Sequence, residues 1–141
     1  MKRKTKLQAR NSLSSTKPAS TRRKPAKRQR VSDKRWRSPA YLAFVRSLPC
    51  SLCGAFGCDP HHVIGLGWGL SGMGLTAPDS FAMAACRTCH RKIHNEPALQ
   101  QMQPTWLRWT IRTALAEDMD TKARAELTHA LAFIEAREEI V

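Results

Sequence analysis

Residues 50–94 read CSLCGAFGCDPHHVIGLGWGLSGMGLTAPDSFAMAACRTCHRKIH and hold all five cysteines, four of the five histidines and all seven glycines of the 141-residue chain. The stretch begins with a Cys-x-x-Cys pair, Cys50 and Cys53, and nearly ends with a second, Cys86 and Cys89. Two such pairs, separated by a few tens of residues, are typical of a structural zinc site in which four thiolates surround one ion. We therefore expect a scaffold stabilised by zinc on these four cysteines.

The histidines of this stretch follow a different pattern. His61 and His62 are adjacent, whereas His90 and His94 lie four residues apart. That second spacing places two side chains on one face of a helix. The pattern predicts a second metal site, distinct from the cysteine site and open to a substrate.

The fifth cysteine has two interpretations. Cys58 could replace one of the four zinc ligands, or it could be a small buried residue. We favour the buried residue, because the two Cys-x-x-Cys pairs already complete a tetrahedron.

Positive charge is concentrated at the start of the chain. Residues 1–37 contain fifteen Lys or Arg and one acidic residue, a net charge of +14, whereas residues 38–141 carry 9 basic and 10 acidic residues, or −1. The first segment has few apolar side chains, so we expect a basic arm that is disordered on its own. Its natural partner is nucleic acid phosphate, and the simpler alternative is a solubilising tail. The arm residues predicted to bind nucleic acid are Arg22, Arg23, Lys24, Lys27, Arg28, Arg30, Lys34, Arg35 and Arg37.

No apolar run in the sequence is long enough for a signal peptide or a membrane span. The basic arm also lacks the apolar helical face of a mitochondrial presequence. We therefore expect a cytoplasmic protein that does not bind membranes. Five cysteines in such a chain suit reduced metal thiolates better than disulfides.

The expected folded domain covers residues 38–141 and begins with a helix over residues 38–48, because Ser38 can cap it and Pro39 can occupy its first position. Short strands are expected at residues 62–64 and 81–84. Between them lies a glycine-rich loop, which contains Gly65, Gly67, Gly69, Gly72 and Gly74. A helix is expected at residues 86–96, and Pro97 ends it. The segment from Cys50 to Glu96 would form the core.

A helical hairpin is expected over residues 104–138. Thr105 can cap its first helix, with Trp106, Trp109, Ile111 and Leu115 on the buried side. The two tryptophans could instead stack on bases, but tryptophans at helical spacing usually belong to a core. The second apolar stripe consists of Ala123, Leu127, Ala130, Leu131 and Ile134, and His129 is expected on the surface.

The adjacent histidines, the two cysteine pairs and the ending Cys-x-x-Cys-His-x-x-x-His occur in an order that resembles the HNH endonucleases, which have the ββα-metal fold. The sequence is similar in particular to small HNH proteins of phages and prophages, including the group around the RecA-dependent Ref nuclease, which also carries a basic disordered arm. The resemblance covers roughly residues 38–116. It implies a small α+β fold with a zinc-stabilised ββα-metal core, flanking helices and a disordered basic arm. The chain departs from the family at the middle letter, where Asp79 stands in place of the usual Asn.

The resemblance also implies roles for these residues. His62 would be the general base that takes a proton from water, since a neutral imidazole is available at cellular pH. His61 and His94, with His90, would bind a divalent metal, most simply magnesium or manganese, with zinc or nickel as alternatives. Asp79 would orient His62 through an imidazole N–H, and the alternatives are a metal ligand or a turn residue.

The implied function is metal-dependent hydrolysis of DNA phosphodiester bonds in phage or prophage recombination or DNA processing. The implied partner is DNA, either free or already held by a recombinase filament. A non-catalytic, zinc-stabilised nucleic-acid-binding module is the alternative that the cysteines alone would favour. The sequence does not indicate an oligomeric state.

Overall fold

The computed structural model describes residues 35–72 and 74–138. The chain divides into two units between Asp33 and Lys34, and the described residues belong to the second. Residues 1–34 lie outside the described part, and with them the expected disorder of the arm and the seven predicted nucleic-acid-binding residues from Arg22 to Lys34.

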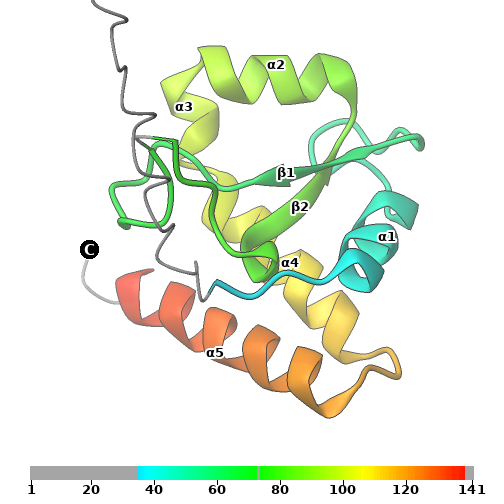
Figure 1. The fold of residues 1–141 in the computed structure, drawn as a ribbon. Coiled ribbons are helices and arrows are strands. Elements are labelled where there is room, and N and C mark those ends of the chain that lie inside the picture. Colours follow the sequence, from blue (N-terminus) through cyan, green and yellow to red (C-terminus); the bar gives the residue numbers. More distant parts are fainter. Residues whose placement is uncertain (1–34, 73, 139–141) are drawn as a thin grey trace, which may run out of the picture. The chain divides into compact units, whose positions relative to one another are not determined.

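The second unit is a small α+β fold with one two-stranded sheet (Figure 1), as expected. Its elements, in chain order, are α1 (Pro39–Ser47), β1 (Asp59–His62), the 3-10 turn η1 (Asp79–Phe81), β2 (Ala82–Ala85), α2 (Arg87–Asn95), α3 (Pro97–Gln100), α4 (Gln103–Leu115) and α5 (Thr121–Glu138). In the described residues, no helix is long and apolar enough to cross a membrane.

The two strands are antiparallel, and all four residues of β2 are buried. His61 lies opposite Met83, and His62 lies opposite Ala82. Figure 1 shows α2 on one side of the sheet and α4 on the other, and α1 also packs on both strands. The sheet is thus enclosed by helices and holds the histidine pair at a fixed register.

The first strand differs from the predicted residues 62–64. It runs from Asp59 to His62, so both histidines belong to it. The ladder does not continue through Ile64, because the backbone of this residue pairs with the side chain of Gln103. A side chain from α4 therefore pairs with the last residue of the predicted strand, and β1 ends at His62, where the sequence pattern predicts its start.

The second strand begins one residue later than predicted, because Asp79–Phe81 forms the 3-10 turn. The following helix lies within its predicted limits, with Cys86 as its N-cap. Pro97 follows α2 as expected and also starts the short helix α3.

α1 has the predicted construction. The Ser38 hydroxyl accepts a hydrogen bond from the Tyr41 N–H at 3.2 Å, and Pro39 occupies the first turn. This N-cap satisfies a donor that would otherwise have no partner at the start of the helix.

The prediction for α4 was wrong at its start and on its buried face. The helix begins at Gln103, two residues before the proposed Thr105 cap. Its buried face follows Leu107, Ile111 and Ala114, so Trp109 points away from the core with 48% of its surface exposed. Trp106 and Leu115 are partly buried at the edges of this face.

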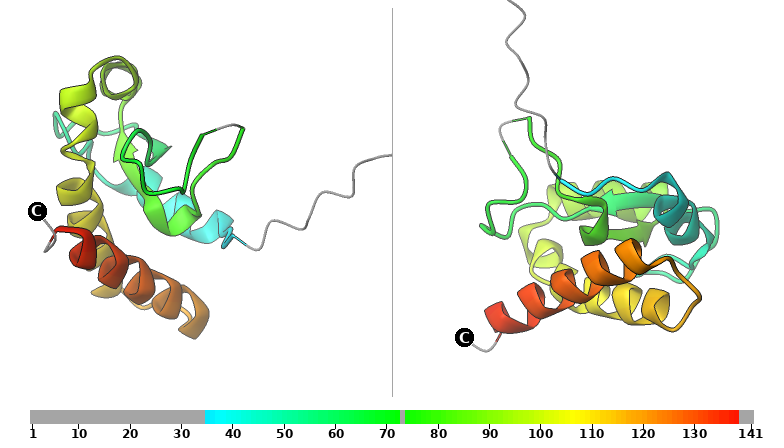
Figure 2. Two further views of the ribbon diagram at one scale, coloured as in Figure 1. Left: turned by 90° about the vertical axis from the view of Figure 1, so that its left-hand side faces the viewer. Right: turned by 60° about the horizontal axis from the view of Figure 1, so that its bottom comes forward.

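α5 packs along α4, and both views in Figure 2 show the two helices side by side. Its buried residues include four of the five predicted apolar positions, and Leu131 is partly buried. His129 is exposed, as expected. Trp68 of the glycine-rich loop contacts the Phe81 and Phe133 rings edge-on, with centroids 6.4 and 5.7 Å away, so this part of the loop is anchored to α5.

Candidate metal centres and active site

Four cysteines gather into one cluster, as the sequence predicts. The sulfur atoms of Cys50, Cys53, Cys86 and Cys89 all lie within 4.8 Å of one another, and the Cys53 and Cys86 sulfurs are 3.7 Å apart. A tetrahedron of thiolates with zinc–sulfur bonds of about 2.3 Å has edges of about 3.8 Å. These four residues could therefore hold a structural metal such as zinc.

The backbone around the first cysteine pair is tied to the sheet. The Cys50 N–H donates to the Ala55 carbonyl at 2.8 Å, and the Ser51 N–H donates to the Ala84 carbonyl of β2 at 3.0 Å. Burial raises the pKa of Cys50, but hydrogen bonds from nearby backbone N–H groups outweigh this effect and lower it to about 6. A thiol that ionises this readily is prepared to bind a metal as thiolate.

Cys58 is buried outside this group of four sulfurs. Its thiol donates to the Ala55 carbonyl at 3.2 Å. Burial, with the charge of the neighbouring cysteines, raises the pKa of Cys58 to about 11. The side chain thus has the properties of a small buried residue that stays protonated.

Three histidines form a second cluster. Ring nitrogens of His61, His90 and His94 all lie within 4.8 Å of one another, and the Nε2 atoms of His90 and His94 are 3.1 Å apart. The His61 ring stands edge-on to both other rings, with centroids 4.7 and 5.4 Å away. Three converging imidazoles are a common ligand set for a divalent metal.

His61 has an unused nitrogen that fits this interpretation. The side chain is 1% exposed, and its Nε2 lies 2.9 Å from the Gln103 Oε1, which can only accept a hydrogen bond. The proton is therefore on Nε2, and the buried Nδ1 has no hydrogen-bond partner. Burial also lowers the pKa of His61 to about 4, so the ring stays neutral. A neutral imidazole with a free, buried lone pair suits a metal ligand.

Gln103 is a residue that the sequence interpretation missed. It is fully buried, and its Oε1 also accepts from the Ile64 N–H at 3.2 Å, while its Nε2 donates to the Ile64 carbonyl at 2.7 Å. This amide fixes the orientation of His61 and ends β1 at the same time. A single glutamine 42 residues away from His61 carries no signal in the sequence that would reveal this role.

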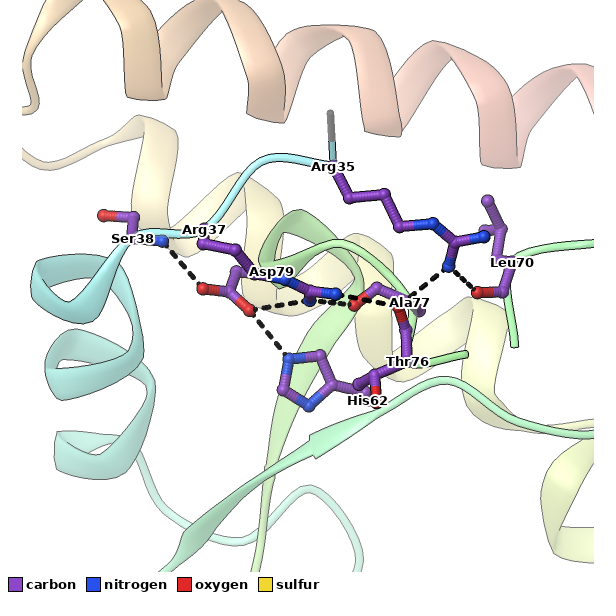
Figure 3. A network of polar contacts seen from close by, with 8 residues as sticks. All are labelled: Arg35, Arg37, Ser38, His62, Leu70, Thr76, Ala77 and Asp79. Atoms are coloured by element: carbon purple, nitrogen blue, oxygen red, sulfur yellow. Dashed lines mark hydrogen bonds and ion pairs between the residues drawn. The ribbon is translucent and has the colours of Figure 1, made fainter. Parts of the chain in front are cut away.

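His62 points to the opposite side of β1 and contacts Asp79 (Figure 3). Its Nε2 lies 2.9 Å from the Asp79 Oδ1. Because a carboxylate can only accept, we assign the proton to Nε2, which leaves the lone pair on Nδ1. The carboxylate is 3% exposed, and its Oδ2 accepts from the Ser38 N–H at 2.7 Å. Asp79 therefore lies within hydrogen-bond distance of His62, and its orienting role stays a prediction.

A pocket of about 210 Å³ brings the two sets of histidines together. Its lining comes from β1, from α2 and from the end of the glycine-rich loop. The lining residues are Pro60, His61, His62, Val63, Ile64, Ser71, Leu75, Thr76, Ala77, His90 and His94. The pocket is large enough for a small group such as a phosphate.

Two predicted phosphate-binding residues, Arg35 and Arg37, are described and contact the protein itself. Arg35 donates to the carbonyls of Leu70 and Thr76, and Arg37 donates to the carbonyls of Thr76 and Ala77. Arg37 also lies 3.3 Å from the Asp79 carboxylate. Their internal contacts give these two arginines a role in the folded unit that the charge pattern does not indicate.

Comparison with known proteins places the chain in a family. The family described as "Protein of unknown function (DUF968)" matches residues 6–126, and the chain belongs to this family. The chain is also 41% identical over 63 residues to the "Uncharacterized protein YdfU" of Escherichia coli (strain K12). That match covers 45% of this chain and 18% of the relative, so the chain spans less than a fifth of the relative's length. No solved structure matches the chain significantly.

Proposed function

We propose that this DUF968 protein is a metal-dependent DNA endonuclease of the HNH type, with β1, β2 and α2 as its ββα-metal core. One observation carries the proposal: neighbouring histidines on β1 face two different tasks. His61 has a buried nitrogen without a hydrogen-bond partner and clusters with His90 and His94, whereas His62 is hydrogen-bonded to Asp79. Both tasks meet in one pocket.

The first task is to hold a divalent cation. His61, His90 and His94 would bind it, and Gln103 keeps the ligand nitrogen of His61 unprotonated. When bound, the cation supplies charge stabilisation for the phosphate and for the departing oxygen. Magnesium or manganese is the ion that we propose from the HNH resemblance, and zinc or nickel are the alternatives that imidazole ligands favour.

The second task is to take a proton from water. The His62 Nδ1 carries the available lone pair, because Nε2–H is donated to Asp79. After the proton moves to Nδ1, the imidazolium is stabilised by the buried carboxylate at 2.9 Å. The division is therefore between cation ligands on one face of β1 and the base on the other.

The partner that we propose is DNA. The basic arm would bind its phosphates and present the DNA to the pocket. We propose that the protein acts in the cytoplasm, in phage or prophage recombination or DNA processing. The charge of +14 in residues 1–37 supports this proposal, because neutralising phosphates releases counterions. Deleting residues 1–34 should weaken DNA binding and flatten its dependence on salt. An unchanged salt slope would assign the arm to another partner, for instance a recombinase.

The test of the function is a plasmid nicking assay of the full chain with magnesium, manganese, nickel or zinc, on free DNA and on DNA covered by a recombinase. We expect nicked circles that require a divalent metal and disappear with chelator. Binding without nicking under every condition would overturn the nuclease and leave a zinc-stabilised nucleic-acid-binding module.

A further inference from the structure

The segment Arg35–Ser38, here called the junction segment, surrounds the carboxylate that orients His62 (Figure 3). The Asp79 N–H donates to the Trp36 carbonyl at 3.0 Å, and the Ser38 N–H donates to the Asp79 Oδ2 at 2.7 Å. Arg37 Nη1 donates to the Asp79 Oδ1 at 3.3 Å. The same Oδ1 accepts the hydrogen bond from His62. Asp79 is thus held through its backbone and both oxygens by residues about 40 positions earlier in the chain.

The same segment holds the glycine-rich loop. The Arg35 guanidinium donates to the Leu70 carbonyl and, at 2.8 Å, to the Thr76 carbonyl, so it joins the two sides of the loop. Arg37 donates to the carbonyls of Thr76 and Ala77 at 3.0 and 2.6 Å. Thr76 and Ala77 line the pocket. The junction segment therefore contacts both the wall of the pocket and the residue that orients the base.

Arginine is suited to this task for a chemical reason. Its planar guanidinium has five donors in a fixed fork, and it can serve a carboxylate and two carbonyls at once. A lysine at the same place keeps the positive charge but lacks the fork. The buried carboxylate of Asp79 also needs compensation, since an ion removed from water without partners is costly.

We propose that Arg37 is a positioning residue for the general base, which acts on His62 through Asp79, and that Arg35 fixes the pocket wall beside it. This proposal rests on the proposed nuclease function and deepens it. It assigns the last residues of the basic segment to the construction of the active site, in place of the phosphate contacts that their charge suggests.

A competing role for Arg37 is direct contact with substrate phosphate, because 42% of its side chain is exposed. The two roles predict different behaviour in a double-mutant cycle. If Arg37 acts through Asp79, its removal has little further effect once Asp79 is absent. If it binds phosphate by itself, the two losses multiply.

The experiment compares nicking by wild type, Arg37→Ala, Arg37→Lys, Asp79→Ala and the double variant Arg37→Ala/Asp79→Ala. We expect Arg37→Ala to lower kcat by roughly 10- to 100-fold at nearly constant KM, since small misplacements of a catalytic group have effects of this size. Arg37→Lys should recover part of the loss. The double variant should match Asp79→Ala. Multiplied losses, or a rise in KM alone, would overturn the positioning role.

Arg46→Ala is the matched control, because Arg46 is an exposed arginine in the last turn of α1. It removes the same charge and should leave kcat unchanged. Equal losses in both arginine variants would mean that only net charge matters, which contradicts the proposal. Thermal unfolding of each variant shows that the compared proteins are folded.

A proton NMR measurement tests the positioning role of Arg37 without requiring that the protein cleave DNA. The His62 Nε2–H, hydrogen-bonded to Asp79, should give a downfield proton NMR signal that is absent from His62→Ala. Arg37→Ala should broaden or shift this signal, and Arg46→Ala should not. If wild type never nicks DNA, the nuclease proposal fails, and the NMR comparison still decides whether Arg37 positions the pair. An unchanged signal in Arg37→Ala would overturn the positioning role.

Discussion

The cysteine cluster and the histidine cluster share helix α2 but differ in what surrounds them. Cys86 and Cys89 lie at the start of this helix, and His90 and His94 follow in its next turns. The four cysteine sulfurs lie close together, and backbone hydrogen bonds hold the turn that carries the first pair. The histidine nitrogens instead line a pocket with one face formed by the glycine-rich loop.

One helix can thus serve stability and chemistry together. Once four sulfurs hold the first turn of α2, the direction of the helix axis is determined, and so is the place of the next residues along it. The pair four residues apart then lies beside the ring of His61. A small sheet with little apolar area needs such a fixed point, because its burial alone contributes little stability.

The largest effect should come from breaking the cysteine cluster. Cys50→Ser removes one buried sulfur from the set of four. Structural zinc in small domains contributes on the order of 10 kcal/mol, comparable with the whole stability of a domain, so this variant should fail to fold. Circular dichroism and zinc analysis would measure both losses. Cys58→Ser, a buried cysteine outside the cluster, should stay folded and keep its zinc; a folded, zinc-free Cys50→Ser protein would contradict the assignment.

Emptying the histidine cluster should abolish cleavage and leave the fold intact. Gentle dialysis against a chelator should remove the exchangeable metal but leave about one zinc per chain, because a closed thiolate site releases its ion more slowly than an open one. His94→Ala should have the same result without chelator. Metal content, circular dichroism and nicking activity should be measured on one sample. Simultaneous loss of fold and activity would mean that the two clusters are not independent.

Replacing the proposed base should have a smaller effect than removing the metal. His62→Ala removes no sulfur and no proposed metal ligand, so fold, metal content and DNA affinity should persist. Cleavage should fall by roughly 100- to 10,000-fold, the usual contribution of general acid–base catalysis. His129→Ala, an exposed histidine on α5, is the control. Equal activity of the two variants would exclude His62 as the base.

The smallest effect is expected for Asp79→Asn. Asn is the usual residue of HNH proteins at this position, which suggests tolerance, but here both carboxylate oxygens accept from N–H groups of His62 and Ser38. An amide offers only one acceptor, so one of these donors loses its partner at a cost of about 1–3 kcal/mol. Thermal unfolding should show this cost, and nicking should fall less than in His62→Ala. An unchanged melting temperature would mean that the site adapts to the amide.

Much of both clusters could be predicted from spacing alone. Cys-x-x-Cys pairs and histidines four apart on a helix are local patterns, and local geometry brings such residues together wherever the helix forms. The sequence also singled out Asp79, which lies beside His62 as expected. α1 was predictable for the same reason, since Ser38 and Pro39 determine its start.

The missed parts depend on contacts between distant segments. Gln103 and Arg37 lie about 40 residues from the groups that they orient, and neither belongs to a recognisable pattern. β1 was misplaced because the Gln103 side chain competes for the backbone of Ile64. Trp109 was assigned to the core because it is a tryptophan at helical spacing, but the buried face of α4 follows Leu107, Ile111 and Ala114 and leaves Trp109 exposed.

The alternation of His61 and His62 along a four-residue strand restricts how this chain can change in length. Because neighbouring side chains point to opposite faces, inserting or deleting one residue beside this pair would exchange their surroundings. The histidine proposed as a metal ligand would then face Asp79, and the histidine proposed as the base would face α2. The four residue pairs that set the register of β1 and β2 all lie outside the glycine-rich loop between them. Natural relatives should therefore keep the spacing from the second cysteine to the histidine pair.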